Sequence, residues 1–360
     1  MNKKLNRYIF FRLLTITAFV LMVLIFIFLV LDFSENSDDF TDKGATMAEI
    51  FGTYYLNYIP EMIRLVSPLA AFVACLYLTG QMADRFEIIS LKAAGISLYR
   101  LIMPYIVFAL LLVCIISYLD GFVIPQANSE RIAFENKYLR KRTEKVDRSR
   151  VYRQESENSI FHINSFDANS QTAYRVQVVE FKGDSVSKTM NIERMVWQQD
   201  ENKWQLIDVE ERIFTPMGFT YQYSDSADTT LNILPRDLAR TTSDIYQLTY
   251  PQAVNYIAAI ERSGASGSEL PKIQFYGRLA YPVSILVLVI VGFAIASVRR
   301  PGGKGFHIAS GLTISFLYLA FMKVIEPFGA QGAMSPTIAA FLPHLLFFLL
   351  GIGLLIGVRK

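Results

Sequence analysis

The sequence predicts a helical membrane protein with six membrane-spanning helices and one large β-rich domain inserted between the third and the fourth. Three observations predict this fold class. Of 360 residues, 52% are hydrophobic and only 19% are charged, which is more apolar than two soluble domains require. The apolar residues gather in long runs, and a run of about 18 or more can cross a lipid core as a helix. A long polar stretch separates the third run from the fourth.

The apolar runs are each long enough to span a membrane with some tilt. The first run follows Lys3, Lys4 and Arg7 and offers no small-x-small cleavage site, which favours a retained anchor over a signal peptide. The six runs cover residues 9–31, 59–80, 101–124, 275–298, 306–325 and 337–358.

Basic residues of the short connections predict the orientation, because Lys and Arg are enriched in cytoplasmic loops. One set of connections is basic, and the opposite ones, 32–58 and 326–336, are poor in basic residues. Both chain ends are therefore expected in the cytoplasm. The basic set is Lys3, Lys4, Arg7, Arg85, Lys92, Arg100, Arg299, Arg300, Lys304, Arg359 and Lys360.

Residues 126–272 are polar and rich in turns, and the parity of the spans places them on the outer side. Ala127 to Lys145 is predicted to continue the third span as a helix. Short β-branched and aromatic runs follow and predict a sandwich or jelly roll. These runs are Ser159–Phe166, Tyr174–Phe181, a Met195–Gln198/Lys203–Ile207 hairpin and Lys203–Phe214, followed by a helix at Pro251–Arg262 and a flexible Ser263–Ser268 segment. The expected domains are 1–125, 126–272 and 273–360.

The residues that enzymes use are sparse and scattered. His162, His307 and His344 fall in three distant segments, and no Cys/His/carboxylate cluster or nucleophile motif accompanies them. We therefore expect no catalytic residue, no metal and no cofactor. The net charge of +3 is spread without a basic patch, which argues against nucleic acid as a partner.

The segment at about 81–100 is longer than a simple turn between two spans requires. Its pattern predicts an amphipathic helix with Phe86, Ile89, Ala93 and Ile96 on one side. Two interpretations stay open: the helix inserts into a groove of a cytoplasmic motor subunit, or it rests on lipid headgroups. In the first case the charges that set its register are Asp84, Arg85, Glu87 and Lys92.

Three basic residues lie within spans, near the outer ends of their helices. Arg64 has Glu61 and Lys323 has Glu326 three residues away, so local ion pairs or snorkelling explain both. Arg278 has no carboxylate within a helical turn. The alternative is that all three face a cavity and hold the phosphate of an anionic lipid, with Arg278 the strongest candidate.

Several local strings, in order and over nearly the whole chain, resemble the lipopolysaccharide-export permease family, LptF/LptG, and the LptG members slightly more. The string that begins at Glu87 is the most specific. The strings are Arg7-Tyr8-Ile9, Ser67-Pro68-Leu69-Ala70-Ala71, Glu87-Ile88-Ile89 with Lys92-Ala93-Ala94-Gly95-Ile96, Pro282, Gly311–Phe316 and Leu342-Pro343.

The resemblance implies an inner-membrane permease that works with a second permease and a cytoplasmic ATPase dimer. It implies a periplasmic jelly-roll-like domain that passes lipopolysaccharide to periplasmic bridge proteins, and a contact between Glu87 and the ATPase. One departure stands out: Asp32 lies where LptG-like sequences often carry a basic residue that contacts lipid phosphate. Two rivals stay open, a permease for another lipid or lipoprotein and a membrane-anchored sensor or scaffold.

Overall fold

The computed structural model divides the chain into two compact units. The helical unit comprises Met1–Lys141, Tyr246–Tyr250 and Lys272–Lys360, and the β-rich unit comprises Arg142–Ile245 and Pro251–Pro271. The structure describes residues 3–139, 151–156, 158–167, 170–183, 185–198, 203–215, 218–229, 244–262, 268–298 and 303–358.

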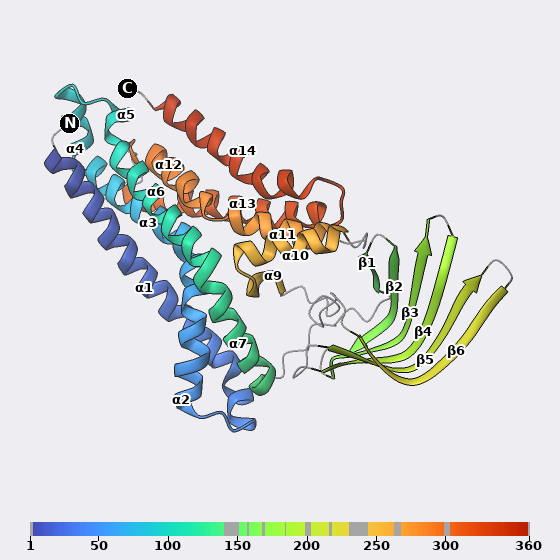
Figure 1. Ribbon diagram of the computed structural model, residues 1–360. Coiled ribbons are helices and arrows are strands. Elements are labelled where there is room, and N and C mark those ends of the chain that lie inside the picture. The colour runs from blue at the N-terminus through green and yellow to red at the C-terminus, as the bar shows by residue number, and fades with distance from the viewer. Residues whose placement is uncertain are drawn as a thin grey trace. The chain divides into compact units, whose positions relative to one another are not determined.

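Long apolar helices build the helical unit (Figure 1). Five stretches are long and apolar enough to span a membrane, and a sixth, broken pair of helices accounts for the fourth predicted span. The spans are α1 (Lys3–Asp42); α2 (Met47–Glu49), η1 (Ile50–Tyr55) and α3 (Leu56–Asp84); α5 (Leu98–Leu101), α6 (Met103–Tyr118), η2 (Leu119–Val123) and α7 (Ile124–Tyr138); α11 (Glu269–Ala280) with α12 (Val283–Ala296); α13 (Gly303–Ala330); and α14 (Pro336–Gly357).

The fourth span bends by 47° between α11 and α12. Pro282 precedes the first residue of α12, and proline supplies no N–H to continue the α11 ladder. Tyr281 fills the break, donating its N–H to the Gly277 carbonyl and its hydroxyl to the Leu65 carbonyl of α3 at 2.7 Å. The break therefore stays tied to α3.

Helix α12 is the centre of the helical unit. It is apolar all round, as a helix enclosed by others must be, and it packs against α3, α6, α13 and α14. Close approach relies on small residues: a Cβ on Gly292 would meet the Phe72 ring at 2.9 Å. Helix α1 contrasts with it, since many large apolar side chains of α1 are exposed.

The connection predicted as one amphipathic helix over 81–100 is divided. Helix α3 runs on to Asp84, and Phe86 adopts a left-handed conformation (φ 61°) before the short helix α4 (Glu87–Ala93). Gly95, at φ +80°, ends α4 with the Ile96 N–H bonded to the Leu91 carbonyl. Within α4, Ile88 is buried and Ile89 is exposed, and the preceding Phe86 is exposed as well.

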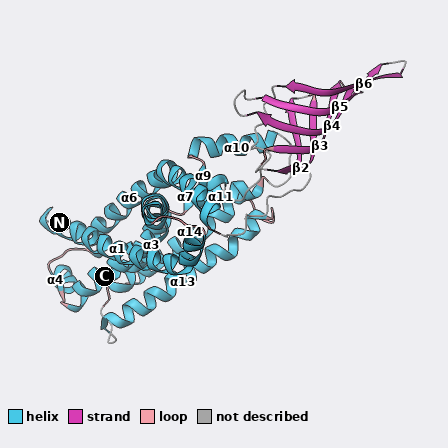
Figure 2. Ribbon diagram, turned by 90° about the horizontal axis from the view of Figure 1, so that it is seen from below, coloured by secondary structure: helices cyan, strands magenta, loops and turns pink. Residues whose placement is uncertain are grey.

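The β-rich unit holds one six-stranded antiparallel sheet in which each strand pairs with the next along the chain (Figure 2). The predicted all-β domain and the hairpin are confirmed, with Gln198 opposite Lys203. The consecutive order of the described strands is a meander, whereas a jelly roll contains Greek-key crossings. The strands are β1 (Val151–Ser156), β2 (Ser159–Asp167), β3 (Thr172–Lys182), β4 (Ser185–Gln198), β5 (Lys203–Thr215) and β6 (Gly218–Thr229).

A crease crosses the sheet from β2 to β6. At the crease the pairing skips one residue in each of these strands, and two of the skipped residues, Arg175 and Asp208, have positive φ. Buried apolar residues stand three apart on either side, as with Ile192 and Met195, so both halves present their apolar face to one core. The skipped residues are Asn164, Arg175, Glu193, Asp208 and Asp225.

Two further helices match predictions. Helix α7 confirms the helical continuation of the third span as far as Tyr138, and α10 (Tyr250–Arg262) confirms the helix predicted at Pro251–Arg262. A short helix, α9 (Asp244–Gln247), precedes α10. The rest of the predicted helix, residues 140–145, and most of the Ser263–Ser268 segment lie outside the described residues.

Candidate functional site

A cavity of about 410 Å³ lies within the helical unit, between α3, α11, α13 and α14. The three intramembrane cations singled out in the sequence, Arg64, Arg278 and Lys323, all line it. The remaining wall is mostly apolar or aromatic. It includes Leu65, Leu69, Tyr246, Ile273, Tyr281, Leu319, Met322, Pro343 and His344.

Arg278 has a carboxylate partner that its own helix does not supply. Its Nε lies 3.4 Å from Oδ1 of Asp120 in η2, and its side chain is 1% exposed. Nη1 donates to the Leu248 carbonyl at 2.9 Å, and Nη2 donates to the main-chain carbonyl of Asp120. The Tyr250 ring lies 5.2 Å from the guanidinium carbon. Arg278 therefore ties η2 and the segment Tyr246–Tyr250 to α11.

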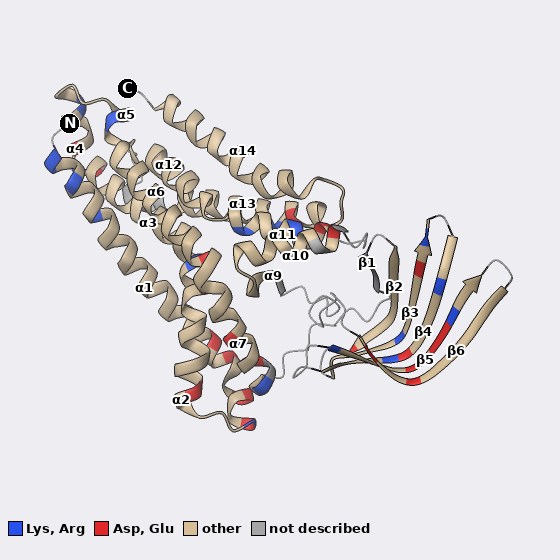
Figure 3. Cartoon of the chain, in the orientation of Figure 1, with Lys and Arg blue, Asp and Glu red and all other residues tan. Residues whose placement is uncertain are grey.

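Arg64 is held more loosely. Its Nε lies 3.8 Å from Asp120 Oδ1, its Nη2 lies 3.8 Å from Glu61, and its side chain is 12% exposed. Glu61 is engaged more closely by Arg131 of α7, at 2.7 Å, and Arg131 also contacts Glu135 at 3.4 Å. Charges of alternating sign thus run from α7 through α3 and η2 to α11. The middle of α1 and the whole of α14, by contrast, carry no charged residue (Figure 3).

Lys323 is the exposed cation of the cavity. It forms the expected ion pair with Glu326, at 2.9 Å, and its side chain is 81% exposed. Asp32 lies elsewhere in the helical unit: on α1 it accepts a hydrogen bond from the Tyr54 hydroxyl at 3.4 Å, beside an aromatic cluster of Phe33, Tyr54 and Tyr55. Asp32 does not line the cavity.

Sequence reasoning missed Asp120 and the segment Tyr246–Tyr250. Asp120 carried a usable signal, since it is a carboxylate inside the third apolar run, and ionisable residues within spans usually pair with one another. Leu248 carried none, because its contribution is a main-chain carbonyl.

Four charged residues of the 81–100 segment, those expected to set its register, lie at or after the opposite end of α3. Asp84 is the last residue of α3, Arg85 caps it, Glu87 opens α4 and Lys92 lies in its last turn. Around them, Phe86 and Ile89 are 47% and 52% exposed, so α4 presents apolar as well as charged groups to its surroundings.

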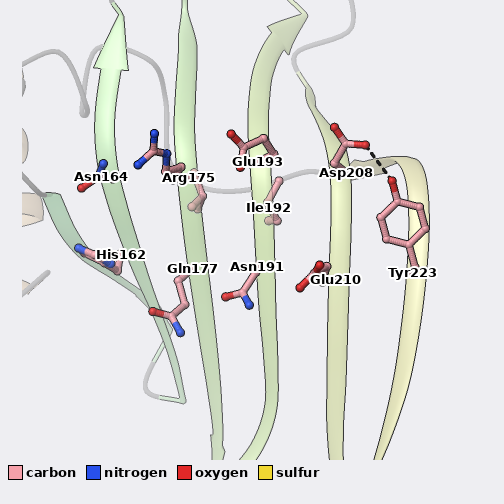
Figure 4. A pocket seen from close by; sticks show the side chains of 11 residues that line it. His162, Asn164, Arg175, Gln177, Asn191, Ile192, Glu193, Asp208, Glu210 and Tyr223 are labelled. Carbon is pink, nitrogen blue, oxygen red and sulfur yellow. Dashed lines mark hydrogen bonds between the residues drawn. The ribbon is translucent and has the colours of Figure 1, made fainter.

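A second hollow, of about 580 Å³, lies on the polar face of the sheet at the crease (Figure 4). His162, Arg175, Glu193, Asp208 and Tyr223 are among its lining residues. The Tyr223 hydroxyl donates to Asp208 at 2.9 Å, and this bond raises the pKa of Tyr223 to about 12. Tyr223 and Asp208 thus bond to each other across β5 and β6, and within the described ranges no group of three His, Cys, Asp or Glu residues is placed to bind a metal.

Comparisons with known proteins agree with the architecture. The sequence profile of the family described as lipopolysaccharide export system permease LptF/LptG matches residues 7–357. The chain is similar to the lipopolysaccharide export system permease protein LptG of Escherichia coli (strain K12), with 20% identity over 98% of this chain and 97% of that protein. It is also similar to LptG of Haemophilus influenzae (strain Rd), with 22% identity over 96% of each chain. The chain, with its membrane spans and inserted antiparallel sheet, belongs to the LptF/LptG family of lipopolysaccharide export permeases.

Proposed function

We propose that the chain is one permease half of an ATP-driven transporter that extracts lipopolysaccharide from the bacterial inner membrane and passes it to periplasmic bridge proteins. A second permease completes the transmembrane part, and a separate cytoplasmic ATPase dimer hydrolyses ATP. Membership of the LptF/LptG family supports this assignment. The basic connections favour cytoplasmic termini and a periplasmic β-rich unit.

The cavity lined by three cations is the observation that carries the proposal. Arg64, Arg278 and Lys323 come from three different helices and meet around one mostly apolar hollow. Cations in an apolar wall attract phosphate strongly, because little water competes for them. At about 410 Å³ the cavity is much smaller than a whole lipopolysaccharide, so it receives one phosphorylated part of the lipid headgroup.

The α4 end is the proposed contact with the motor. Exposed Phe86 and Ile89 offer apolar area, while Asp84, Arg85, Glu87 and Lys92 surround it with charge. An apolar centre with a charged rim is typical of protein interfaces, where the charges select the partner and set the register. Glu87 is the residue we expect to make the principal polar contact.

Photo-crosslinking tests the lipid assignment. A photoreactive residue in place of Met322, which lines the cavity, should form an adduct with lipopolysaccharide in the intact transporter. The matched control is Val107 of α6, an exposed apolar residue outside the cavity wall, which should give none. Phospholipid adducts at 322 without lipopolysaccharide would favour a permease for another lipid. Equal lipopolysaccharide adducts at both positions would contradict the proposal.

A further inference from the structure

Asp120 occupies an unusual place in the third span. It lies in η2, a π-helical turn between α6 and α7, and its side chain is 1% exposed. Single π-helical turns inside helices occur frequently at functional sites, because the extra residue redirects side chains. Here the redirected side chain is a carboxylate enclosed by the helical unit.

One oxygen of Asp120 serves two cations. Oδ1 lies 3.4 Å from Arg278 Nε and 3.8 Å from Arg64 Nε, and these cations belong to α11 and α3. Both arginines line the cavity, whereas Asp120 does not. Asp120 therefore acts on the cavity through the arginines and not by touching its contents.

The two arginines differ in what they have left to offer. All three nitrogens of Arg278 face acceptors inside the protein: the Asp120 carboxylate, the Asp120 main-chain carbonyl and the Leu248 carbonyl. Both carboxylates near Arg64 lie at 3.8 Å, beyond hydrogen-bond distance. Nε of each arginine lacks a hydrogen bond among the residues described, so the two differ at their Nη nitrogens, which bond to main-chain carbonyls in Arg278. Arg64 thus keeps donors for a ligand.

The ion pairs around Asp120 are unequal in closeness. Arg131 contacts both Glu61 and Glu135, and Asp120 faces both Arg278 and Arg64. Because Arg278 is the closer partner of Asp120 and is fully enclosed, Arg64 is the more loosely held cation, and it lies beside the cavity.

Stability alone does not explain this arrangement. Asp120 Oδ2 is buried without a hydrogen-bond partner in the described part of the chain, and a buried carboxylate with an unmet oxygen is costly. Apolar residues of similar volume often replace buried ion pairs without loss of stability. Such a carboxylate is expected where its charge organises other groups.

We propose that Asp120 is a positioning residue for an anion site at Arg64. It fixes Arg278 in the wall as a structural anchor and holds Arg64 beside the cavity, so that Arg64, with Lys323, binds a phosphate group of the lipid headgroup. The inference rests on the proposed function and refines it: Arg64, and not Arg278, is the guanidinium that touches the lipid.

The test measures preference for phosphate. The intact transporter carries a photoreactive residue at position 322 and receives either lipid A or lipid A stripped of its phosphates. The ratio of the two adduct yields is the phosphate preference. Arg64→Ala should lower this ratio about tenfold, and Asp120→Asn about fivefold, as expected for loss of a charge-assisted contact and for its misplacement. Asp120→Glu should restore the ratio to within about twofold.

A double-variant cycle separates positioning from general damage. In the Arg64→Ala background, Asp120→Asn should lower the ratio no further, because Asp120 acts through Arg64. Glu135→Gln, which neutralises the far end of the same ion chain, is the matched control and should leave the ratio unchanged. Asp120→Asn combined with Arg278→Gln removes the fully enclosed cation together with its carboxylate, so Arg278 is not left buried without a counter-charge. It keeps the experiment decisive if Asp120→Asn alone fails to assemble, and it should also lose the preference.

Each outcome has a distinct meaning. If the wild-type transporter forms no lipid A adduct at 322, the proposed function of the cavity is wrong and the positioning role falls with it. If the wild type prefers phosphorylated lipid and Asp120→Asn retains that preference, only the positioning role is wrong. A further loss caused by Asp120→Asn in the Arg64→Ala background would likewise overturn it.

Discussion

The two ends of helix α3 hold their charged side chains in opposite ways. Near its start, Arg64 belongs to a buried chain of ion pairs that joins α7, α3, η2 and α11. At its other end, Asp84 and Arg85 lead directly into the short helix α4, whose surroundings are exposed. Twenty residues of α-helix, about 30 Å, separate Arg64 from Asp84.

The difference separates two kinds of charge. A buried charge with close partners contributes to the fold, and its removal leaves those partners buried without a counter-charge. An exposed charge on a short helix contributes little to its own fold, so what it does must depend on another molecule. We therefore expect substitutions around Arg64 to affect stability and lipid binding. Substitutions around α4 should affect only the binding of the ATPase.

The largest effect is expected from Arg278→Ala. The variant removes the cation closest to Asp120 and leaves the Leu248 carbonyl without its donor. Breaking a buried ion pair by removing one partner typically lowers the free energy of unfolding by about 3–5 kcal/mol. Denaturant unfolding of the purified protein would measure it, with Lys323→Ala, the exposed cation, as the control expected to change little. If Arg278→Ala lowered the free energy of unfolding as little as Lys323→Ala, Arg278 would not stabilise the packing of η2 against α11.

A smaller loss of free energy of unfolding is expected from Gly121→Ala, at the residue next to Asp120. A Cβ at position 121 would lie 2.6 Å from the Tyr250 ring, which packs beneath Arg278, so the ring has to move. Overpacking of this kind typically costs about 1–3 kcal/mol. Gly52→Ala is the matched control, because Gly52 lies in the other π-helical turn, η1, and has nothing within 4 Å. Equal stability of the two variants would mean that the Tyr250 contact adapts freely.

Local patterns were enough to predict the spans, the hairpin and the helix at Pro251–Arg262. Long apolar runs and alternating strands are properties of neighbouring residues, so sequence reveals them directly. The crease was missed, although buried pairs three apart, such as Ile192 and Met195, interrupt the alternation and mark it. The division of the 81–100 segment was missed because Phe86, at φ 61°, carries no glycine or proline signal.

The sequence predicted which cations line the cavity, but it did not predict the ion pairs that Arg278 and Arg64 form with Asp120. Arg278 and Asp120 are 158 residues apart, so periodicity within α11 gives no sign of the pair. The expectation that Arg278 lacks a carboxylate within its own helical turn is correct and incomplete, because η2 supplies one. Arg64 was a weaker candidate than Arg278 for the lipid-phosphate contact, because Glu61, three residues away, offered a local ion pair. In the structure Glu61 lies closer to Arg131 than to Arg64.

At the α4 end, Glu87 is half-buried, and Glu87→Ala should change the free energy of unfolding by no more than about 1 kcal/mol, a usual value for a single substitution outside the core. We expect the variant to insert normally but to retain the ATPase poorly, since truncating one member of an interfacial charge pair typically costs about 2–5 kcal/mol of binding. Recovery of the ATPase on the purified permease measures this. Glu130→Ala, an exposed glutamate of α7, is the matched control and should retain the ATPase. If both variants retain it and export continues, Glu87 does not contact the motor.

The smallest effect on stability is expected from single cysteines introduced at exposed positions. Labelling of these cysteines tests whether α4 and the β-rich unit face opposite sides of the membrane. With Cys75 and Cys114 replaced by alanine, a cysteine at exposed Ser90 of α4 should react with an impermeant thiol reagent only after the cytoplasmic side is opened. A cysteine at exposed Ser226 of β6 should react in sealed spheroplasts. The expectation rests on the asymmetry of Lys and Arg, which groups the α4 connection with the basic set predicted to be cytoplasmic. Labelling of Ser90 and Ser226 from the same side would contradict the orientation and remove α4 from reach of a cytoplasmic ATPase.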